Sequence, residues 1–153
     1  MAELFLADEA ATAALGHRLA GLLRVGDVVF LEGDLGTGKS TLARACLQAL
    51  AGAAITVPSP TFTLVQTYEF AELAVWHVDL YRLAPGTPVD DLALVEALET
   101  GALLIEWPDR LPADAFPERL AVRLAWPEGG DGRRATLEPG TGWHDRLEAL
   151  RPT

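Results

Sequence analysis

The chain has 153 residues, half of them apolar, and a formal net charge of −10. Its length and apolar share predict one domain over residues 1–153 with a real core, and they exclude a disordered chain. The acidic balance argues against a direct grip on nucleic acid, because Lys39 is the only lysine and such proteins usually present a basic face. The chain has neither a signal-peptide pattern nor an apolar stretch that could span a membrane, so we expect a cytoplasmic protein with no membrane partner.

The first third of the chain predicts alternating strands and helices. A short strand over Glu3–Leu6 is followed by a helix over Glu9–Leu23, for which Asp8 is a typical N-cap. The apolar run Asp27–Glu32 is typical of a buried strand. A second helix is predicted over Ser40–Leu50, because its apolar residues recur at helical spacing.

Between this strand and helix, Gly33–Ser40 fits the phosphate-loop pattern G-x-x-x-x-G-K-[ST]. Glycines let backbone N–H groups close around phosphate oxygens, and the helix offers its amino-terminal dipole to the same anion. Lys39 would bring positive charge to the β- and γ-phosphates, and the Ser40 hydroxyl would ligate Mg²⁺. The pattern thus predicts a nucleoside triphosphate site with Mg²⁺. The expected contacts are Gly33, Asp34, Leu35, Gly36, Thr37, Gly38, Lys39, Ser40 and Thr41.

The rest of the chain mixes β-prone segments with turns. Val57–Pro60 must be irregular, because its prolines remove donors and restrict their neighbours. The expected elements are a hairpin of Thr61–Phe70 with Leu73–Tyr81, a helix over Leu92–Leu98, a strand over Gly101–Glu106, a hairpin of Arg119–Trp126 with Arg134–Glu138, and a terminal helix over Trp143–Leu150. This mixture predicts an α/β, P-loop NTPase-like three-layer domain with a mixed parallel and antiparallel central sheet.

Two of the expected strands end in an acid, Asp79 and Glu106. The carboxyl ends of parallel strands line the ligand crevice, and a triphosphatase needs a carboxylate near Mg²⁺ and a group that orients the attacking water. Each acid alone could instead be a solvated strand end. His77 alternates with Asp79 and so could share its strand face, where a hydrogen-bonded core histidine is favoured over a catalytic base.

Three hydroxyl residues lie at the irregular entry to the strand that follows the loop helix: Ser59, Thr61 and Thr63. GTPase-like proteins carry a switch that senses the γ-phosphate at this position in the chain. The hydroxyls could equally satisfy a turn around the prolines, so the residue types leave both interpretations open.

Four segments, in this order, resemble the TsaE (YjeE) family of small bacterial ATPases of tRNA threonylcarbamoyladenosine synthesis: Gly33–Ser40, Ser59–Leu64, His77–Leu83 and Leu104–Pro108. The resemblance covers nearly the whole chain. It implies a Mg²⁺-dependent ATPase, weak without its protein partners TsaB and TsaD, that meets tRNA only indirectly. TsaD would transfer the threonylcarbamoyl group to adenosine 37, and ATP hydrolysis here would allow repeated turnover.

The resemblance also implies roles for residues around the phosphates. Ser40 and Glu106 match the family's metal ligands, and Glu106 also matches the acid at the attacking water. Asp79 matches the switch acid and Thr61 the switch threonine. Together with Lys39 of the loop, Glu106, Asp79 and Thr61 are the residues expected to be catalytic.

Three further positions are implied near the nucleotide. Trp107 adjoins Glu106 and is expected to shape its position. Arg133 resembles a late arginine beside the nucleotide, and residues 8–12 are expected to border the adenine. With the loop, Trp107 and Arg133 complete the expected ATP contacts.

A GTPase, a small-molecule kinase and a scaffold that hydrolyses little are the alternatives. Guanine specificity normally rests on an N-K-x-D motif, and the chain has no asparagine. Asp79-Leu-Tyr-Arg82 also lacks the glycine of a D-x-x-G switch. A kinase typically needs a lid of arginines, whereas Arg82, Arg110 and Arg119 are scattered in sequence. A scaffold would bind nucleotide at the same site as an ATPase, so only the extent of hydrolysis distinguishes the two.

Overall fold

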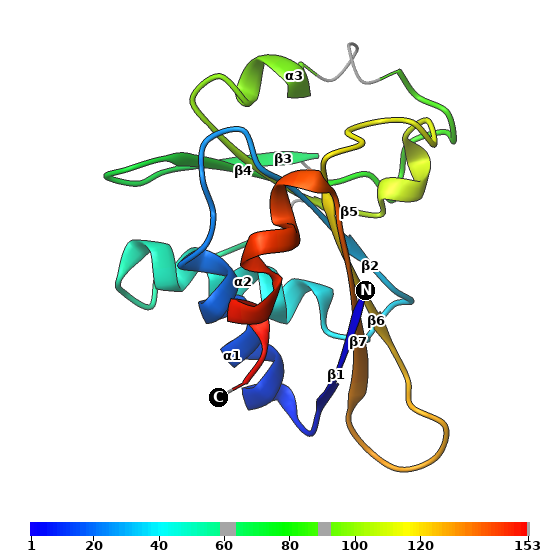
Figure 1. Cartoon of the computed structure of the whole chain (residues 1–153). Helices are drawn as coiled ribbons and strands as arrows, with labels where there is room; N and C mark the ends of the chain where they lie inside the picture. The colour runs from blue at the N-terminus through cyan, green and yellow to red at the C-terminus, as the bar shows by residue number, and fades with distance from the viewer. Residues whose placement is uncertain (59–63, 89–92, 153) are drawn as a thin grey trace.

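A computed structural model describes residues 1–58, 64–88 and 93–152. Within these residues seven strands form one sheet in the order β1-β7-β6-β2-β5-β4-β3 (Figure 1). β6, β2, β5 and β4 run parallel to one another, and β7, β1 and β3 pair antiparallel at the two sides. This confirms the predicted mixed sheet. The strands are β1 Ala2–Leu6, β2 Val28–Glu32, β3 Val65–Glu69, β4 Ala74–Asp79, β5 Gly101–Glu106, β6 Leu120–Ala125 and β7 Arg133–Pro139.

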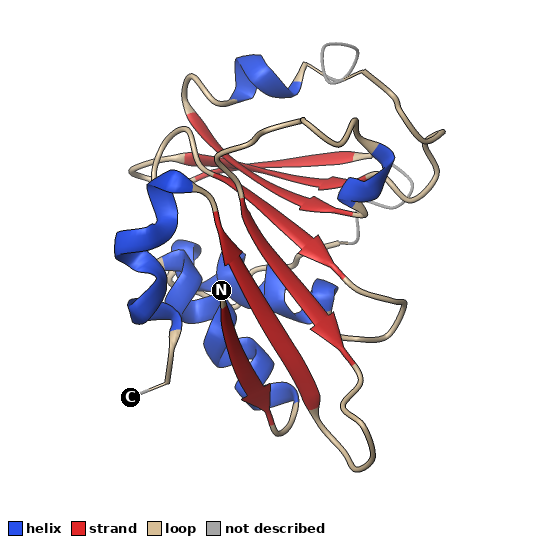
Figure 2. Ribbon diagram, turned by 45° about the vertical axis from the view of Figure 1, so that its right-hand side comes forward, coloured by secondary structure: helices blue, strands red, loops and turns tan. Residues whose placement is uncertain are grey.

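Helical segments cover both faces of the sheet, as Figure 2 shows. One face packs against three of them, α1 Glu9–Ala20, α2 Lys39–Ala51 and the 3-10 helix η3 Thr141–Leu150. The other face is covered by the short α3 Leu94–Ala97 and the segment around Leu111 and Ala115, next to the one-turn η2 Pro108–Arg110. The three layers are therefore confirmed, although the second helical layer is thin. Within the described parts of the chain, no helix has the length and apolar character needed to cross a bilayer.

Several predicted boundaries were wrong by a few residues. α1 ends at Ala20 rather than Leu23. The Gly21 N–H still donates to the His17 carbonyl oxygen, but the N–H groups of Leu22 and Leu23 both donate to the Leu19 carbonyl oxygen and so close the helix. The helix expected over Leu92–Leu98 is described only as Leu94–Ala97, and residue 92 lies outside the described residues. The terminal helix is a 3-10 helix that begins at Thr141. Both predicted hairpins are present, as β3 with β4 and β6 with β7.

The central strand β2 is buried on both faces, which its run of Val28-Val-Phe-Leu31 predicts. Val29 and Leu31 face α1 and α2, whereas Val28 and Phe30 belong to the core under α3. Apolar side chains on both faces fix the strand in the middle of the molecule, and its carboxyl end carries the glycine loop.

Gly16 lets α1 and α2 pack closely on the loop side of the sheet. A Cβ at Gly16 would lie 2.5 Å from the Leu42 carbonyl oxygen and 3.0 Å from the Ala45 Cβ. Both of those atoms belong to α2, the helix that begins at the loop. The small residue therefore sets the distance between the two helices, and with it the position of α2.

We expect Gly16→Ala to lower the free energy of unfolding by about 1–3 kcal/mol, since the added methyl forces two helices apart. Gly21→Ala is the control, because Gly21 has an ordinary helical φ of −68° and its nearest neighbour would be 3.6 Å from the new Cβ. It should raise stability by about 0.5 kcal/mol. Urea denaturation measures both changes. Equal effects of the two variants would contradict the close packing at Gly16.

Candidate nucleotide site

The loop predicted to bind phosphate joins the end of β2 to the start of α2. Gly33, Gly36 and Gly38 have φ values of 141°, 82° and 109°, a region that favours glycine. At Gly33 a Cβ would also collide with the carbonyl oxygen of Leu124 on β6. The Thr37 hydroxyl donates to the Asp34 carbonyl oxygen at 2.7 Å and closes the loop from inside. The glycines are thus required by geometry and not only by a sequence pattern.

The amino terminus of α2 is open to an anion. Its N-cap is Gly38, which provides no side-chain cap, and the first turn contains no acidic residue. The first N–H groups of a helix have no partner within the helix, and the helix dipole adds partial positive charge there. Loop and helix terminus together make an arrangement suited to phosphate oxygens.

Lys39 turns its ammonium back into the loop. The residue is 5% exposed, its Nζ donates to the Gly33 carbonyl oxygen, and Nζ lies 3.6 Å from the ring centroid of Trp107. Burial lowers the pKa of Lys39 below its ordinary value, although the carboxylates of Glu106 and Asp79 act in the opposite direction. The ammonium is therefore held close to two acids in a partly dehydrated position.

Asp79 and Glu106 meet at the ends of two neighbouring strands. They are register partners in the parallel pair β4–β5, and they are 6% and 3% exposed. Glu106 Oε1 accepts from Ser40 Oγ at 3.4 Å, and Asp79 Oδ1 accepts from the Tyr81 backbone N–H at 2.9 Å. A cavity of about 250 Å³ lies among these groups. It is lined by Leu35, Gly36, Gly38, Lys39, Ser40, Thr41, Asp79, Glu106 and Trp107.

Trp107 forms part of the wall of this cavity beside Lys39. It directly follows β5 and has a φ of 58°, uncommon for a large side chain. Its ring lies 4.9 Å from the ring of Tyr81, which is 42% exposed. Tyr81 in turn donates its backbone N–H to Asp79, so contacts run from Asp79 and from Lys39 to a residue with an exposed side chain.

A smaller hollow of about 180 Å³ shares the loop glycines and Thr41 with the first. Asp8, Thr12 and Arg133 line it, so the segment expected near the adenine and the expected late arginine lie together. Arg133 Nη2 donates to the Gly36 carbonyl oxygen at 3.3 Å, and its Cζ lies 3.7 Å from the ring centroid of Trp126. Trp126 is 50% exposed, and nothing in its sequence context marked it in advance.

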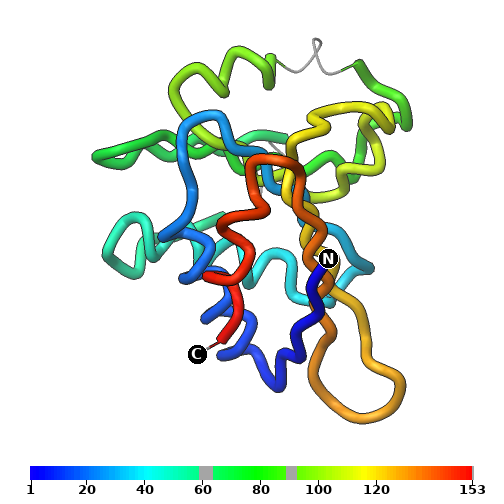
Figure 3. The backbone as a smooth tube through the Cα atoms, in the orientation of Figure 1, coloured from blue at the N-terminus to red at the C-terminus, as the bar shows by residue number. Residues whose placement is uncertain are grey.

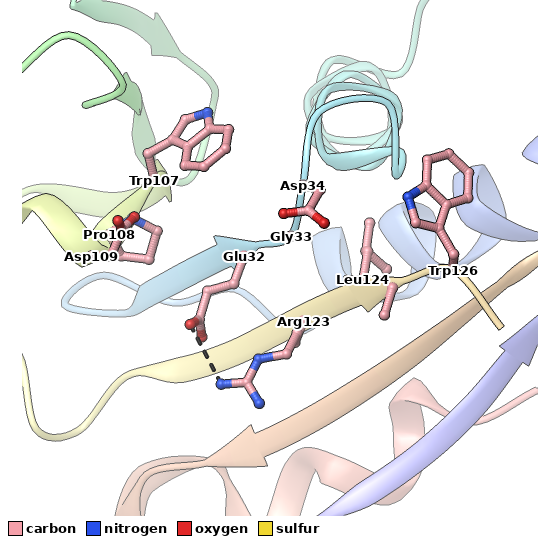
Figure 4. A pocket seen from close by; sticks show the side chains of 10 residues that line it. Glu32, Gly33, Asp34, Trp107, Pro108, Asp109, Arg123, Leu124 and Trp126 are labelled. Carbon is pink, nitrogen blue, oxygen red and sulfur yellow. Dashed lines mark ion pairs between the residues drawn. The ribbon is translucent and has the colours of Figure 1, made fainter. Parts of the chain in front are cut away.

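A hollow of about 490 Å³ lies on another side of the loop, between Trp107 and Trp126 (Figure 4). The turn between β6 and β7, which follows Trp126, projects beyond the sheet (Figure 3). Asp34 lines this cleft rather than the one that contains Lys39 and Ser40. Of the residues expected to act at the phosphates, Thr61 lies outside the described residues, as do Ser59 and Thr63.

The oxygen donors around the 250 Å³ cavity fit Mg²⁺. This ion takes oxygen ligands, keeps several waters, and is usually bound by one or two carboxylates together with substrate phosphates. Ser40 offers a hydroxyl, and Glu106 and Asp79 offer carboxylates. Across the residues that the structure describes, no group of three or more histidine, cysteine or acidic side chains could hold a metal. The donor set therefore suits an ion that is shared with a phosphate chain.

Comparison with known proteins identifies the family. The model of the family "Threonylcarbamoyl adenosine biosynthesis protein TsaE" matches residues 6–135. The TsaE of a Nostoc species is 42% identical over 91% of this chain and 86% of its own length, and that of Rickettsia felis is 36% identical over 79% and 71%. The crystal structure of Bacillus subtilis YdiB matches 97% of this chain and 93% of its own, with a TM-score of 0.76 and 27% identity. The chain belongs to the TsaE family, which acts in tRNA threonylcarbamoyladenosine biosynthesis.

We expect Lys39→Met to weaken ATP binding about 10–100-fold, because a charged hydrogen-bond donor to phosphate is lost. The free energy of unfolding should change by less than about 1 kcal/mol, because the burial that lowers the pKa of Lys39 makes its charged form costly in the folded protein. Arg44→Met removes a cation from the exposed side of the same helix and should leave affinity within about twofold. Calorimetric titration with ATP and thermal unfolding measure these effects. Wild-type affinity in Lys39→Met would contradict the placement of Lys39.

Proposed function

We propose that this member of the TsaE family binds ATP with Mg²⁺ at Gly33–Thr41 and hydrolyses it as an accessory ATPase of tRNA threonylcarbamoylation. The observation that supports this most is the gathering of Lys39, Ser40, Asp79 and Glu106 around one cavity at the amino terminus of α2. We also propose that the whole chain acts as one domain, since a single sheet takes strands from Ala2 to Pro139.

In this proposal the chain's own groups bind the phosphates, hold the metal and orient the attacking water. The loop N–H groups and Lys39 bind the β- and γ-phosphates, and Ser40 and Glu106 hold the metal. Bound Mg²⁺ supplies neutralisation of charge on the phosphate oxygens. Glu106 orients the attacking water, whose oxygen bonds to the γ-phosphorus while the bond to the bridging oxygen of ADP breaks. The products are ADP, inorganic phosphate and the proton that the attacking water releases.

The nucleotide state would reach a partner protein through Asp79, Tyr81 and Trp107. Asp79 accepts the Tyr81 N–H, the Tyr81 ring packs on Trp107, and Trp107 lies over Lys39. Because Tyr81 is exposed, a change at the phosphates can alter a surface side chain through three contacts. We propose that this segment and the switch residues around Thr61 report to TsaB and TsaD.

The charge of the chain supports a role through proteins rather than by direct hold on tRNA. The net charge is −10, and the only lysine lies inside the loop. Contact with tRNA through TsaD and TsaB therefore agrees better with the electrostatics than contact by this chain. As a bacterial-type tRNA-modification protein it would act in the cytoplasm.

The structure gives the kinase alternative little support. The cavity with Lys39 and Ser40 is lined, among the described residues, by none of Arg82, Arg110 and Arg119. Arg110 pairs with Asp109 at 2.8 Å, and Arg119 stacks 4.9 Å from the Phe30 ring centroid. A lid of arginines over the phosphates is therefore not a feature of the described site.

We expect this protein to convert tRNA modification by TsaB and TsaD of the same organism from about one turnover into many, in an ATP-dependent way. Glu106→Ala should bind ATP in EDTA within about threefold of the wild type, but it should lose about tenfold or more of the affinity that Mg²⁺ adds. It should also lose hydrolysis by about 100-fold or more, because the water is no longer oriented. Incorporation of labelled threonine into tRNA and phosphate release measure the two activities.

Glu99→Ala is the matched control, because this exposed acid precedes the amino end of β5, whereas Glu106 lies at the carboxyl end of the same strand. It should behave as wild type in both assays. Normal hydrolysis by Glu106→Ala with the partners present would refute the role of Glu106. An absence of any ATP-dependent gain with the wild-type protein would refute the accessory ATPase function.

A further inference from the structure

Glu106 has a buried partner that the proposed mechanism does not use. His77 Nε2 lies 2.7 Å from Glu106 Oε2, and the two side chains are 1% and 4% exposed. The register of β4 and β5 pairs His77 with Leu104 and Asp79 with Glu106. His77 therefore lies two residues before the level of Glu106, on the same face of the sheet, the one that packs against α2. The contact is therefore fixed by the sheet itself.

The ring nitrogens of His77 have different surroundings. Nδ1 is buried and meets no hydrogen-bond partner among the described residues. Nε2 faces a carboxylate oxygen, which offers only lone pairs, so the ring donates the Nε2 hydrogen to Glu106.

Because of this hydrogen bond, the two carboxylate oxygens of Glu106 have different roles. The terminal torsion of a glutamate is broad, so a carboxylate without such a partner can turn either oxygen into the cavity. Here Oε2 is held by His77, and Oε1 is 3.4 Å from the Ser40 hydroxyl. The oxygen that remains for metal or water is then always the one beside Ser40.

We propose that His77 is a positioning residue, which holds the Glu106 carboxylate in one orientation toward Mg²⁺ and the attacking water. The inference rests on the proposed function, in which Glu106 has that role. Hydrogen-bonded partners of metal ligands commonly matter 10–100-fold for metal affinity or activity. His77 does not itself touch the nucleotide in this proposal.

The test compares His77→Leu, His77→Gln and Val75→Ala. Leucine removes the donor, glutamine replaces it with an amide N–H, and Val75→Ala loosens the same face of the same strand without touching Glu106. Binding of a non-hydrolysable ATP analogue is measured by calorimetry in EDTA and in Mg²⁺. The ratio of the two affinities reports the metal contribution, and kcat and KM for ATP are measured with the partners present.

We expect His77→Leu to keep its affinity in EDTA within about twofold and to lose about tenfold or more of the Mg²⁺ enhancement. It should raise KM by a similar factor and lower kcat about 10–100-fold. His77→Gln should recover most of both losses. Val75→Ala should lower the unfolding temperature but leave the Mg²⁺ enhancement unchanged. Wild-type values in His77→Leu, no rescue by glutamine, or an equal loss in Val75→Ala would each overturn the positioning role.

The same comparison separates the inference from the function on which it rests. If the wild-type protein shows neither Mg²⁺-enhanced binding nor ATP hydrolysis, the proposed function fails and the positioning role fails with it. If the wild type shows both and His77→Leu equals it, only the positioning role fails.

The tautomer gives a readout that depends on neither activity nor stability. Nitrogen-15 spectra of histidine-labelled protein should show a ring that carries hydrogen on Nε2, assigned to His77 by its absence in His77→Gln. The other two histidines, His17 and His144, are exposed and serve as references. A ring protonated on Nδ1 alone would contradict the bond to Glu106.

Discussion

One buried cluster of opposite charges determines how the loop side of the molecule is built. Lys39, Asp79 and Glu106 are each less than a tenth exposed, and all three line one cavity. Burying a charge is costly unless it is paired or hydrogen-bonded, and these three groups lie beside opposite charges and polar neighbours that offset part of that cost. The glycines of the loop, the uncapped start of α2 and the ends of β4 and β5 are the means by which the backbone brings the cluster together.

The convergence of the two acids could be predicted because it depends on a regular feature. Parallel strands end at the same edge of a sheet, and both strands were visible as apolar runs that end in an acid. The contact of His77 with Glu106 could not be predicted in the same way. Alternation places a residue on a face, but the partner across the sheet depends on strand order and register, which one sequence does not reveal.

The helix ends and the outer helical layer also differ in whether local sequence or tertiary packing determines them. The start of α1 was predictable, because the Asp8 side chain accepts from the Ala11 N–H and such caps are local. The thin layer around α3 was less so, because its apolar residues are held by the opposite face of the sheet. Trp126 likewise gains its place beside Arg133 only after the β6–β7 hairpin has folded.

Two parts of the molecule, one of them this hairpin, contribute different properties to the site around the loop. The ends of β4 and β5 and the start of α2 supply the ionisable groups, whereas the β6–β7 hairpin supplies shape: the Leu124 carbonyl behind Gly33 and the Arg133 guanidinium on the Gly36 carbonyl. A substitution in the hairpin can therefore change the curvature of the phosphate-binding backbone while every charged group of the cluster stays the same. The charged groups of the site and the shape of its phosphate-binding backbone are consequently encoded in separate stretches of the chain. The sequence of either stretch can change while the other stays constant.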